Sequence, residues 1–396
     1  MKVLLVLTYY HPHVSGLTIY VQRLATALAQ RGHQVTVLTS RYDRALPAEE
    51  VIDGVHVVRA PVQFRVSKGV IMLTFPFLAW RLIRQHDVVS VHLPQFEASL
   101  LGLLGRLAGR PVVLTYHCDL QLPRGWFNRV LDKVVFVSNY LAGHLAQAAV
   151  AYTQDFAEHS HFLSRFLHKV RVIPPPVIMP SPDQASVKAF QAEHDLAGRP
   201  TVGMAARLAT EKGVEVLIEA TPRLLEAFPR LKVLFAGQYE GVMGEEAYYR
   251  RLMPMIEQLG EEHWEFLGIL TQQQMPAFYA ACDLLVVPSL NSTESFGLVQ
   301  VEAMLCGTPS IASNLPGVRQ PPRMTGMGEV VPIGDSVALA ESIIRILRHP
   351  DDYAQPRRFI EDKFSLERTV SGYETLFEDL VAGRLPVSQP AKARET

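Results

Sequence analysis

The first forty residues alternate between short apolar runs and an amphipathic stretch. Lys2–Thr8 (KVLLVLT) is apolar nearly throughout, as in a strand that is buried on both faces. Thr18–Gln30 has apolar side chains at helical spacing, and Gly32 follows where a helix is expected to stop. Gln34–Thr39 (QVTVLT) is again strand-like. Strand, helix and strand in this order predict a parallel α/β unit.

The same alternation continues to residue 173. Further strands are predicted at Val55–Arg59, Asp87–His92, Pro111–Tyr116, Val150–Thr153 and Lys169–Ile173, and helices at Val70–Arg84, Glu97–Leu107, 126–148 and Asp155–Phe166. The ambiguous stretch is 126–148, within which Lys133–Val137 could form a strand. One long helix is the better interpretation, because a strand and a helix follow directly after it and repeat the earlier layout.

A run of three prolines, Pro174–Pro176, can continue neither a helix nor a central strand and therefore predicts a domain boundary. A second α/β series follows. Its predicted strands are Thr201–Ala205, Lys232–Ala236, Trp264–Leu267, Leu284–Val287 and Ser310–Ala312, and its helices are Val214–Ala227, Glu245–Leu259, Thr271–Ala281, Leu298–Leu305, Ser336–Leu347 and Leu366–Leu380. We predict domains at residues 1–178 and 179–364, a last helical segment at 365–383, and a disordered tail at 384–396.

The composition is that of a folded globular protein. Hydrophobic residues make up 48% and charged residues 19% of the 396 positions, which excludes a disordered or fibrous chain. The three cysteines, Cys118, Cys282 and Cys306, read as reduced thiols of a cytoplasmic protein. No export signal is visible, and the longest apolar run, Val70–Ala79, is too short to span a membrane. We expect a protein that is soluble or bound to a membrane from one side.

The charge is unevenly distributed. Residues 1–180 contain 18 Lys and Arg against 10 Asp and Glu, a net of +8, whereas the remainder contains 20 against 29, a net of −9. The basic half favours an anionic surface such as phospholipid, although two domains that merely differ in surface charge explain the numbers equally well. Nucleic-acid binding has only this charge in its favour and no motif, so we expect no nucleic-acid partner.

The first candidate site lies in Gly203–Gly213 (GMAARLATEKG). A strand ends there, a loop carries Arg207 and Lys212, and a helix begins. Two cations at the carboxyl end of a strand and beside a helix N-terminus can hold an anion, and a planar guanidinium suits a diphosphate. The alternative is a solvated loop in which Arg207 pairs with Glu211.

The second candidate site lies in Glu294–Glu302 (ESFGLVQVE), which follows a predicted strand. A helix starting near Leu298 would direct the backbone N–H groups of residues 296–298 toward a ligand, and Gly297 would let that ligand approach closely. Glu302 would lie about one turn into the helix, where its carboxylate can accept two hydrogen bonds from a vicinal diol such as ribose. The alternative makes Glu294 a helix cap and Glu302 a surface residue.

In this order and at this distance, the two motifs resemble those of the family 4 retaining glycosyltransferases, whose GT-B fold has two Rossmann-like domains facing each other across a cleft. The resemblance implies that Arg207 and Lys212 hold the donor diphosphate and that Glu294 holds hydroxyls of the donor sugar, while Glu302 would bind the ribose. The remaining nucleotide-sugar contacts in the second half would be Gly268, Ser295, Phe296, Gly297 and Leu298. The resemblance extends to Ala303-Met304, Gly307–Pro309, Gly328 and Gly334-Asp335.

The first half resembles the family more weakly and would be the acceptor-binding domain. The family's Gly-Gly loop after the first strand is replaced by Ser15-Gly16, in which Gly16 keeps the close backbone approach. Thr115–Asp119 (TYHCD) resembles a histidine-containing loop near the transferred sugar, so His117 would contact the sugar or its developing charge. A structural histidine is the alternative. The last helix, Leu366–Leu380, matches a family helix that crosses back to the first domain.

The resemblance implies a reaction: retaining transfer of a hexose from a GDP- or UDP-sugar to a hydroxyl of an acceptor sugar or lipid-linked glycan. We expect no cofactor, and no metal because no Asp-x-Asp pair occurs in the expected region. A GT-B sugar-nucleotide epimerase is one alternative, but it should show more acid–base groups than the second half's His194, His263 and His349. A non-catalytic nucleotide-sugar-binding protein is the other, although the motif charges are intact. A dehydrogenase would need a Gly-x-Gly-x-x-Gly loop that is absent.

One stretch of the basic half could contact a membrane. Gln63–Arg84 contains an apolar run with the interfacial aromatic residues Phe75, Phe77 and Trp80. Basic residues flank the run on both sides: Arg65, Lys68, Arg81 and Arg84. A core helix is the alternative for the apolar residues. If the stretch does bind lipid, we expect peripheral binding at the inner face of the plasma membrane.

Overall fold

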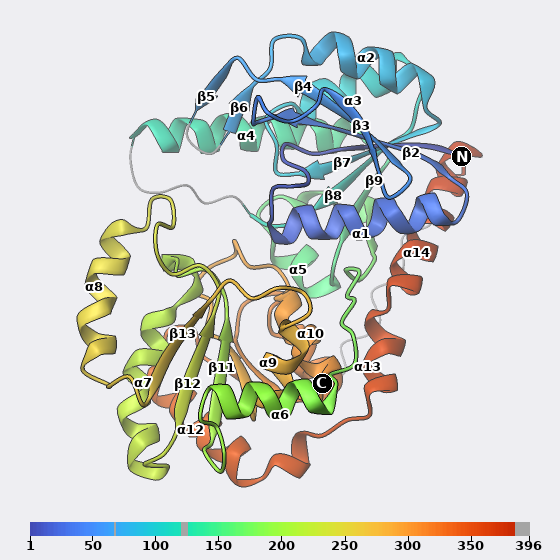
Figure 1. The fold of residues 1–396 in the computed structure, drawn as a ribbon. Helices are drawn as coiled ribbons and strands as arrows, with labels where there is room; N and C mark the ends of the chain where they lie inside the picture. Colours follow the sequence, from blue (N-terminus) through green and yellow to red (C-terminus); the bar gives the residue numbers. More distant parts are fainter. Residues whose placement is uncertain (67–68, 120–125, 385–396) are drawn as a thin grey trace. The chain divides into compact units, whose positions relative to one another are not determined.

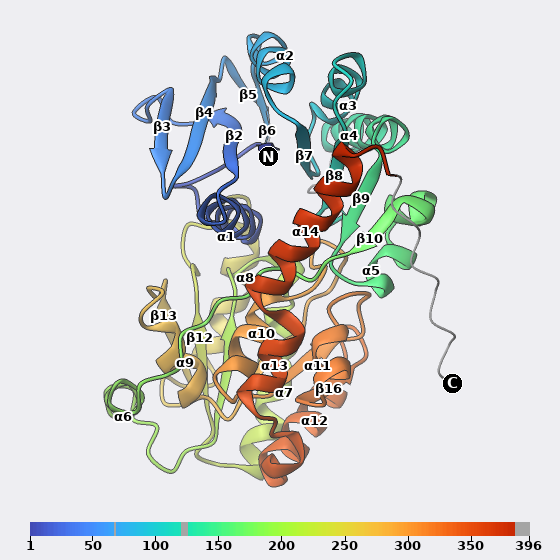
Figure 2. The same cartoon turned by 90° about the vertical axis from the view of Figure 1, so that its right-hand side faces the viewer.

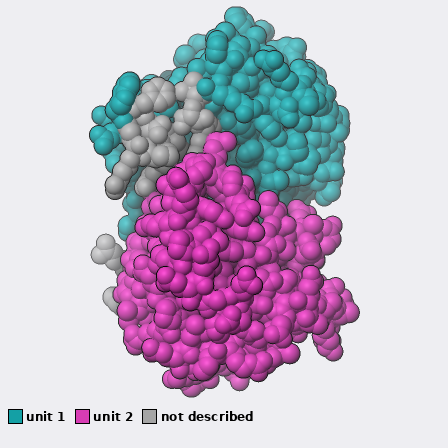
Figure 3. Space-filling view, turned by 60° about the vertical axis from the view of Figure 1, so that its left-hand side comes forward, with its two compact units in different colours: residues 1–176, 366–396 teal, residues 177–365 magenta. Residues whose placement is uncertain are grey.

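The computed structural model describes residues 1–66, 69–119 and 126–384. The chain forms two compact units, which are coloured separately in Figure 3. Unit 1 consists of Met1–Pro176 together with Leu366–Thr396, and unit 2 of Val177–Ser365. The division therefore falls directly after the proline run. The expected tail begins at Arg384, and the rest of it lies outside the described residues.

Unit 1 is built on an eight-stranded sheet in the order β10-β9-β8-β7-β1-β2-β4-β3. Its strands are β1 (Lys2–Val6), β2 (Gln34–Arg41), β3 (Glu49–Ile52), β4 (Val55–Pro61), β7 (Val88–Leu93), β8 (Val112–Tyr116), β9 (Ala148–Ala151) and β10 (Val170–Val172). Every neighbouring pair is parallel except β3 and β4. A separate antiparallel pair joins β5 (Phe64–Val66) to β6 (Gly69–Ile71).

Helices cover both faces of this sheet. They are α1 (Gly16–Gln30), α2 (Phe75–Gln85), α3 (Ala98–Leu107), α4 (Trp126–Leu145), α5 (Gln154–His159) and α14 (Leu366–Val381). Figures 1 and 2 show α2, α3 and α4 along one face, and α1 along the other. Side chains such as Leu4, Leu101 and Leu114 fill the core beneath the first group. Because burial of this apolar surface drives folding, both faces need a helical cover.

The last helix, α14, packs against α1 within unit 1. The Tyr373 hydroxyl lies 2.8 Å from the Tyr20 hydroxyl and 2.8 Å from Thr115 Oγ1, and all three groups are buried. On the surface, Glu374 accepts from Arg31 and from His33. These bonds attach a segment from the end of the sequence to the beginning of the same unit.

Two predicted helices of unit 1 were wrong in extent. The helix predicted at Val70–Arg84 begins only at Phe75, because residues 69–71 pair as a strand and Pro76 favours the first helical turn. The helix predicted at Asp155–Phe166 ends at His159. Ser160 is extended there, and its hydroxyl accepts the N–H groups of Phe162 and Leu163, so a short 3-10 helix (Leu163–Lys169) starts instead. The single long helix preferred at 126–148 is confirmed as α4, although it ends at Leu145.

Unit 2 contains a six-stranded parallel sheet in the order β13-β12-β11-β14-β15-β16. The strands are β11 (Thr201–Ala205), β12 (Lys232–Ala236), β13 (Trp264–Gly268), β14 (Leu284–Val287), β15 (Ser310–Ser313) and β16 (Gly328–Val331). The helices are α6 (Gln184–Glu193), α7 (Val214–Ala227), α8 (Glu246–Glu257), α9 (Met275–Ala281), α10 (Leu298–Leu305), α11 (Gln320–Thr325), α12 (Ser336–Arg348) and α13 (Arg357–Phe364).

The strand order of unit 2 places two loops side by side. From β11 the chain crosses through α7 to β12 on one side, whereas from β14 it crosses through α10 to β15 on the other. β11 and β14 are themselves neighbours, so the loops that follow them leave the same sheet edge and turn in opposite directions. Such switch points are where open α/β sheets bind ligands.

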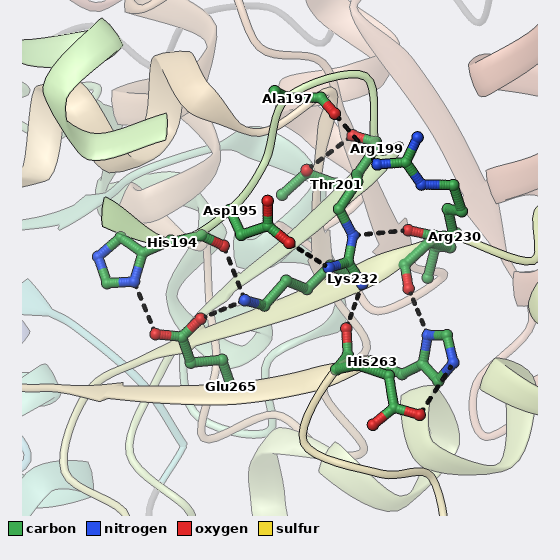
Figure 4. Close-up of polar contacts among 11 residues, drawn as sticks. His194, Asp195, Ala197, Arg199, Thr201, Arg230, Lys232, His263 and Glu265 are labelled. Carbon is green, nitrogen blue, oxygen red and sulfur yellow. Dashed lines mark hydrogen bonds and ion pairs between the residues drawn. The ribbon is translucent and has the colours of Figure 1, made fainter. Parts of the chain in front are cut away.

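A polar network lies at the other end of this sheet, where strands β12 and β13 begin (Figure 4). Lys232 Nζ, at the start of β12, donates to Glu265 Oε2 at 2.6 Å and to the His194 carbonyl at 2.7 Å. His194 Nδ1 lies 2.6 Å from Glu265 Oε1. Burial by itself would raise the pKa of Glu265, but the hydrogen bonds from Lys232 and His194 lower it. The network fastens β12 to β13 at their amino ends, away from the switch point.

Candidate functional site

The loop after β11 depends on Gly213, which has a left-handed backbone (φ +66°) immediately before α7. A Cβ there would lie 2.2 Å from the Pro288 carbonyl oxygen in the loop after β14, so only glycine fits. The Leu290 N–H donates to the Glu211 carbonyl at 2.9 Å. The two loops of the switch point are therefore in direct contact.

Lys212 and Glu294 form the centre of the site. Lys212 Nζ lies 2.5 Å from Glu294 Oε2, and both side chains are half-buried. The other oxygen, Glu294 Oε1, accepts the Gly297 N–H at 3.1 Å. The carboxylate thus occupies a position between a lysine and the N-terminus of α10, where backbone N–H groups and a cation both favour negative charge.

The turn into α10 is held by a glutamine that sequence analysis did not single out. Gln300 is buried, and its Nε2 donates to the carbonyls of Phe296 at 3.0 Å and Val318 at 2.9 Å. Its Oε1 accepts from Ser310 at 3.0 Å. Glycine is again favoured at position 297 because its backbone is left-handed (φ +75°), and a Cβ there would also lie 2.6 Å from Gln300 Nε2. Leu298 is the first helical residue, as predicted, and buried Ser295 precedes the turn.

Glu302 lies on α10 and accepts a hydrogen bond from the Tyr279 hydroxyl at 3.1 Å. Burial, followed by the Glu302 charge, raises the pKa of Tyr279 well above its usual value, so this hydroxyl stays protonated and donates. The tyrosine therefore fixes the carboxylate of Glu302. Gly268 ends β13 at the same edge of the sheet, two strands from β11.

Arg207 is exposed at the end of β11, and its Nη2 lies 3.3 Å from Glu211 Oε1. The sequence alternative, an Arg207–Glu211 pair, is thus present in this structure, and so is the cap-like bond from Glu294 to the helix N-terminus. The roles of Arg207, Lys212, Glu294 and Glu302 toward a ligand stay predictions.

Unit 1 contributes His117, which follows β8 and is buried. Its Nε2 lies 2.9 Å from His92 Nδ1, and its Nδ1 is bonded to the Tyr152 hydroxyl. Burial and the neighbouring His92 lower the pKa of His117, which keeps the ring neutral. Each ring nitrogen already has a partner, so a hydrogen bond to a sugar would replace one of them. The predicted sugar contact stays a prediction.

Gly16 also belongs to unit 1 and is the first residue of α1, two residues earlier than the helix was predicted to start. The Ser15 hydroxyl accepts the Thr18 N–H at 3.2 Å and caps the helix. A Cβ at Gly16 would meet no atom within 4 Å. A ligand could therefore approach the backbone closely at Gly16. The predicted contact of this residue with a phosphate stays a prediction.

Among the residues that the structure describes, no group of three or more His, Cys, Asp and Glu side chains is arranged to hold a metal ion. None of the described helices combines the length and apolar character that crossing a bilayer requires.

Two family models match the chain in succession. The glycosyl transferase 4-like domain matches residues 15–176, and glycosyl transferases group 1 matches residues 187–363. The chain is a family 4 glycosyltransferase. The first match ends at residue 176, where the first segment of unit 1 ends, and the second match lies within unit 2 of the glycosyltransferase.

Curated relatives are similar over most of their length. A phosphatidyl-myo-inositol mannosyltransferase of Mycobacterium leprae is 27% identical, with 88% of each chain covered. A 2-deoxystreptamine N-acetyl-D-glucosaminyltransferase of Streptomyces fradiae is 29% identical, covering 83% of this chain and 82% of the relative. A GDP-mannose-dependent phosphatidylinositol monomannoside mannosyltransferase of Mycolicibacterium smegmatis is 27% identical, covering 88% and 89%.

Solved structures share the fold of this glycosyltransferase. Sucrose-phosphate synthase from Thermosynechococcus elongatus aligns with a TM-score of 0.75 at 23% identity, covering 96% of this chain and 99% of the other. HepE of Anabaena in complex with UDP and glucose aligns with a TM-score of 0.74 at 20% identity, with the same coverage. The predicted GT-B class, with two Rossmann-like α/β domains, is therefore confirmed.

Proposed function

We propose that this glycosyltransferase moves a hexose from a UDP- or GDP-sugar to an acceptor hydroxyl with retention of configuration. The observation that carries the proposal is the carboxylate of Glu294 held between Lys212 and the N-terminus of α10 at the switch point of unit 2. An anion already occupies this position, so a donor diphosphate suits it. The names of relatives support both donor bases, since one uses GDP-mannose and HepE binds UDP-glucose.

During transfer, the bond between the sugar's anomeric carbon and the diphosphate oxygen breaks, and the acceptor oxygen bonds to the same face of that carbon. The acceptor's proton passes to the leaving phosphate oxygen, so no protein nucleophile is needed. Negative charge grows on the diphosphate, and Lys212 and Arg207 would stabilise it together with backbone N–H groups at the N-terminus of α10. Positive charge grows on the sugar.

Glu294 would change partner when the donor binds. Lys212 Nζ would exchange the Glu294 carboxylate for a phosphate oxygen, and the released carboxylate would then accept hydrogen bonds from hydroxyls of the donor sugar. The 2.5 Å pair in this structure would thus keep the lysine in place until the donor arrives. Glu302, held by Tyr279, would accept from the two ribose hydroxyls.

A panel of UDP-, GDP- and ADP-sugars tests the proposal through release of nucleoside diphosphate. We expect one donor class to release diphosphate, faster when an acceptor glycan or glycolipid is present. Conversion of the donor to its epimer without an acceptor would instead support the epimerase alternative. Tight donor binding without any release would support the non-catalytic binding protein.

Substitutions at the two glutamates should separate nucleotide from sugar recognition. Glu302→Ala should weaken binding of the bare nucleoside diphosphate and of the donor alike, because both carry the ribose. Glu294→Ala should leave the bare nucleotide nearly unaffected and weaken the donor. Loss of one hydrogen bond to a charged group corresponds to roughly a ten-fold or larger change in Kd. Calorimetric titration of both ligands into both variants measures this, and an unchanged nucleotide affinity in Glu302→Ala would reject the ribose role.

Transfer should not depend on an added divalent metal, because the protein's own cations would neutralise the diphosphate. Activity measured with an excess of chelator should equal activity without it. Complete loss on chelation, with recovery on adding magnesium or manganese, would contradict this mechanism.

We also propose that the acceptor is linked to or lies close to a lipid, so that unit 1 meets a membrane at the inner face of the plasma membrane. Several relatives are named for phosphatidylinositol substrates. In the stretch Gln63–Arg84, one side of α2 is buried, whereas Phe77 is 80% exposed. The core-helix alternative therefore explains the buried side and leaves Phe77 unexplained. Lys68, which was expected to contribute to this contact, lies outside the described residues.

A further inference from the structure

The long helix α4 exposes an apolar stripe. Its members are Trp126, Val130, Val134, Val137 and Leu141, and they are between 41% and 78% exposed. Their spacings of four, four, three and four residues place them on one side of the helix. A surface helix of a globular protein usually directs polar side chains to solvent, and a contiguous exposed apolar surface indicates an interaction site.

The neighbouring helix extends this surface. Leu103 and Leu107 of α3 are exposed and lie one turn apart. The two helices approach closely, since a Cβ at Gly102 of α3 would lie 3.0 Å from the Leu145 Cβ of α4. Figures 1 and 2 show α2 on the same face of the sheet as α3 and α4. Phe77 of α2 is also exposed.

The charges on these three helices have one predominant sign. Their sequences contain five basic residues, all exposed, and one acidic residue, Asp132; the basic residues are Arg81, Arg84, Arg106, Arg129 and Lys133. The guanidinium of Arg84 lies over the Trp80 ring, 5.6 Å from its centre. A second copy of this chain seated on the same surface would place like charges against each other, whereas an anionic lipid surface would complement them.

We propose that the outer surface of α2, α3 and α4 is a membrane-docking face, in which the stripe of α4 enters the interface of an anionic bilayer. The stripe would bury its apolar side chains at the headgroup boundary, while Arg129 and Lys133 beside it would contact lipid phosphates. This face adds α3 and α4 to the contact proposed for α2, and it deepens the proposed lipid-linked acceptor by naming where the enzyme meets the lipid.

Sedimentation of the full-length protein with vesicles tests the docking face. Vesicles of phosphatidylcholine alone are compared with vesicles that also contain phosphatidylglycerol, at low and high salt. We expect binding to the anionic vesicles only, weakened by salt. The double variant Val134→Glu/Val137→Glu should lower the partition coefficient about ten-fold or more, and Lys133→Gln should lower it about five-fold.

A matched control is Val337→Glu on α12 of unit 2, where the valine is 52% exposed and lies outside the docking face. This variant should bind vesicles like the unmodified protein. Equal vesicle binding by the control and the double variant would overturn the proposal. So would light scattering that shows a dimer which the double variant abolishes, because a second copy would then cover the stripe.

Different experimental results would contradict the proposed function and the proposed docking face. Donor turnover in the absence of vesicles should be the same in the double variant and the unmodified protein, since the stripe lies outside the donor site. If the double variant fails to fold, Lys133→Gln alone decides: unchanged binding to anionic vesicles in that variant overturns the docking face. Vesicle binding by a protein that releases no nucleoside diphosphate would support the docking face and reject the transfer reaction.

Discussion

Lys212→Ala should lower the rate constant for sugar transfer more than it weakens donor binding. The negative charge on the leaving diphosphate is greatest in the transition state, so the lysine stabilises that state more than the bound donor. Losing one charge-assisted contact costs roughly 1.5–3 kcal/mol, or about ten- to a hundred-fold in rate. The variant also leaves Glu294 without its lysine partner while the bond from Gly297 remains. Arg207→Ala should act in the same direction.

Steady-state kinetics with saturating donor measures this effect. The matched control is Arg223→Ala, which removes a cation of α7 whose 2.9 Å pair with Glu341 is exposed and is not part of the switch-point loops. The control should keep its activity. Full activity in both Lys212→Ala and Arg207→Ala would contradict the proposal that these two residues hold the donor diphosphate.

Lys232→Met should lower the free energy of unfolding of unit 2 by about 2–4 kcal/mol, because Glu265 would remain partly buried without its ammonium partner. The expected value is below that for a fully buried pair, since the Glu265 side chain is 29% exposed. The double variant Lys232→Met/Glu265→Leu should recover much of the loss, because it leaves no unpaired carboxylate.

Thermal and denaturant unfolding at neutral pH measure the change, and Arg223→Met, which breaks an exposed pair, should cost less than about 1 kcal/mol. The effect has a defined pH dependence. The folded pKa of Glu265 is lowered, so its stabilising contribution is present above the unfolded pKa and is lost as pH falls through the folded value. The penalty for Lys232→Met should therefore shrink in acid. An equal penalty at every pH would contradict the ion-pair explanation.

Much of the fold follows from local pattern. The predicted strands Lys232–Ala236 and Leu284–Val287 agree with the structure in both bounds, because continuous apolar runs are typical of parallel strands covered on both faces. The strands that sequence analysis missed lack this signal. β3 (EEVI) is a polar edge strand, and β16 (GEVV) is short and begins with glycine. β6 (Gly69–Ile71) overlaps the start of the apolar run that was assigned to a helix, and β5 (FRV) lies before that run and has a charged residue at its centre.

The site was less accessible to sequence reasoning. Lys212 and Glu294 are 82 residues apart and meet only because β11 and β14 are neighbours, which no periodicity reveals. The supporting roles of Gln300 and Tyr279 depend on the same non-local packing. The stripe of α4 was concealed for a different reason: apolar residues surround this helix, so its exposed side cannot be told from its buried side without the structure.

The configuration of the product is the most direct test of the central claim. The sugar nucleotide selected by the panel is supplied with its acceptor, and the anomeric proton of the new glycosidic bond is observed by NMR during the first turnovers. The mechanism in which the leaving diphosphate is held by Lys212 and Arg207, and takes the acceptor's proton, predicts that the product keeps the donor's anomeric configuration. A product of opposite configuration would contradict it.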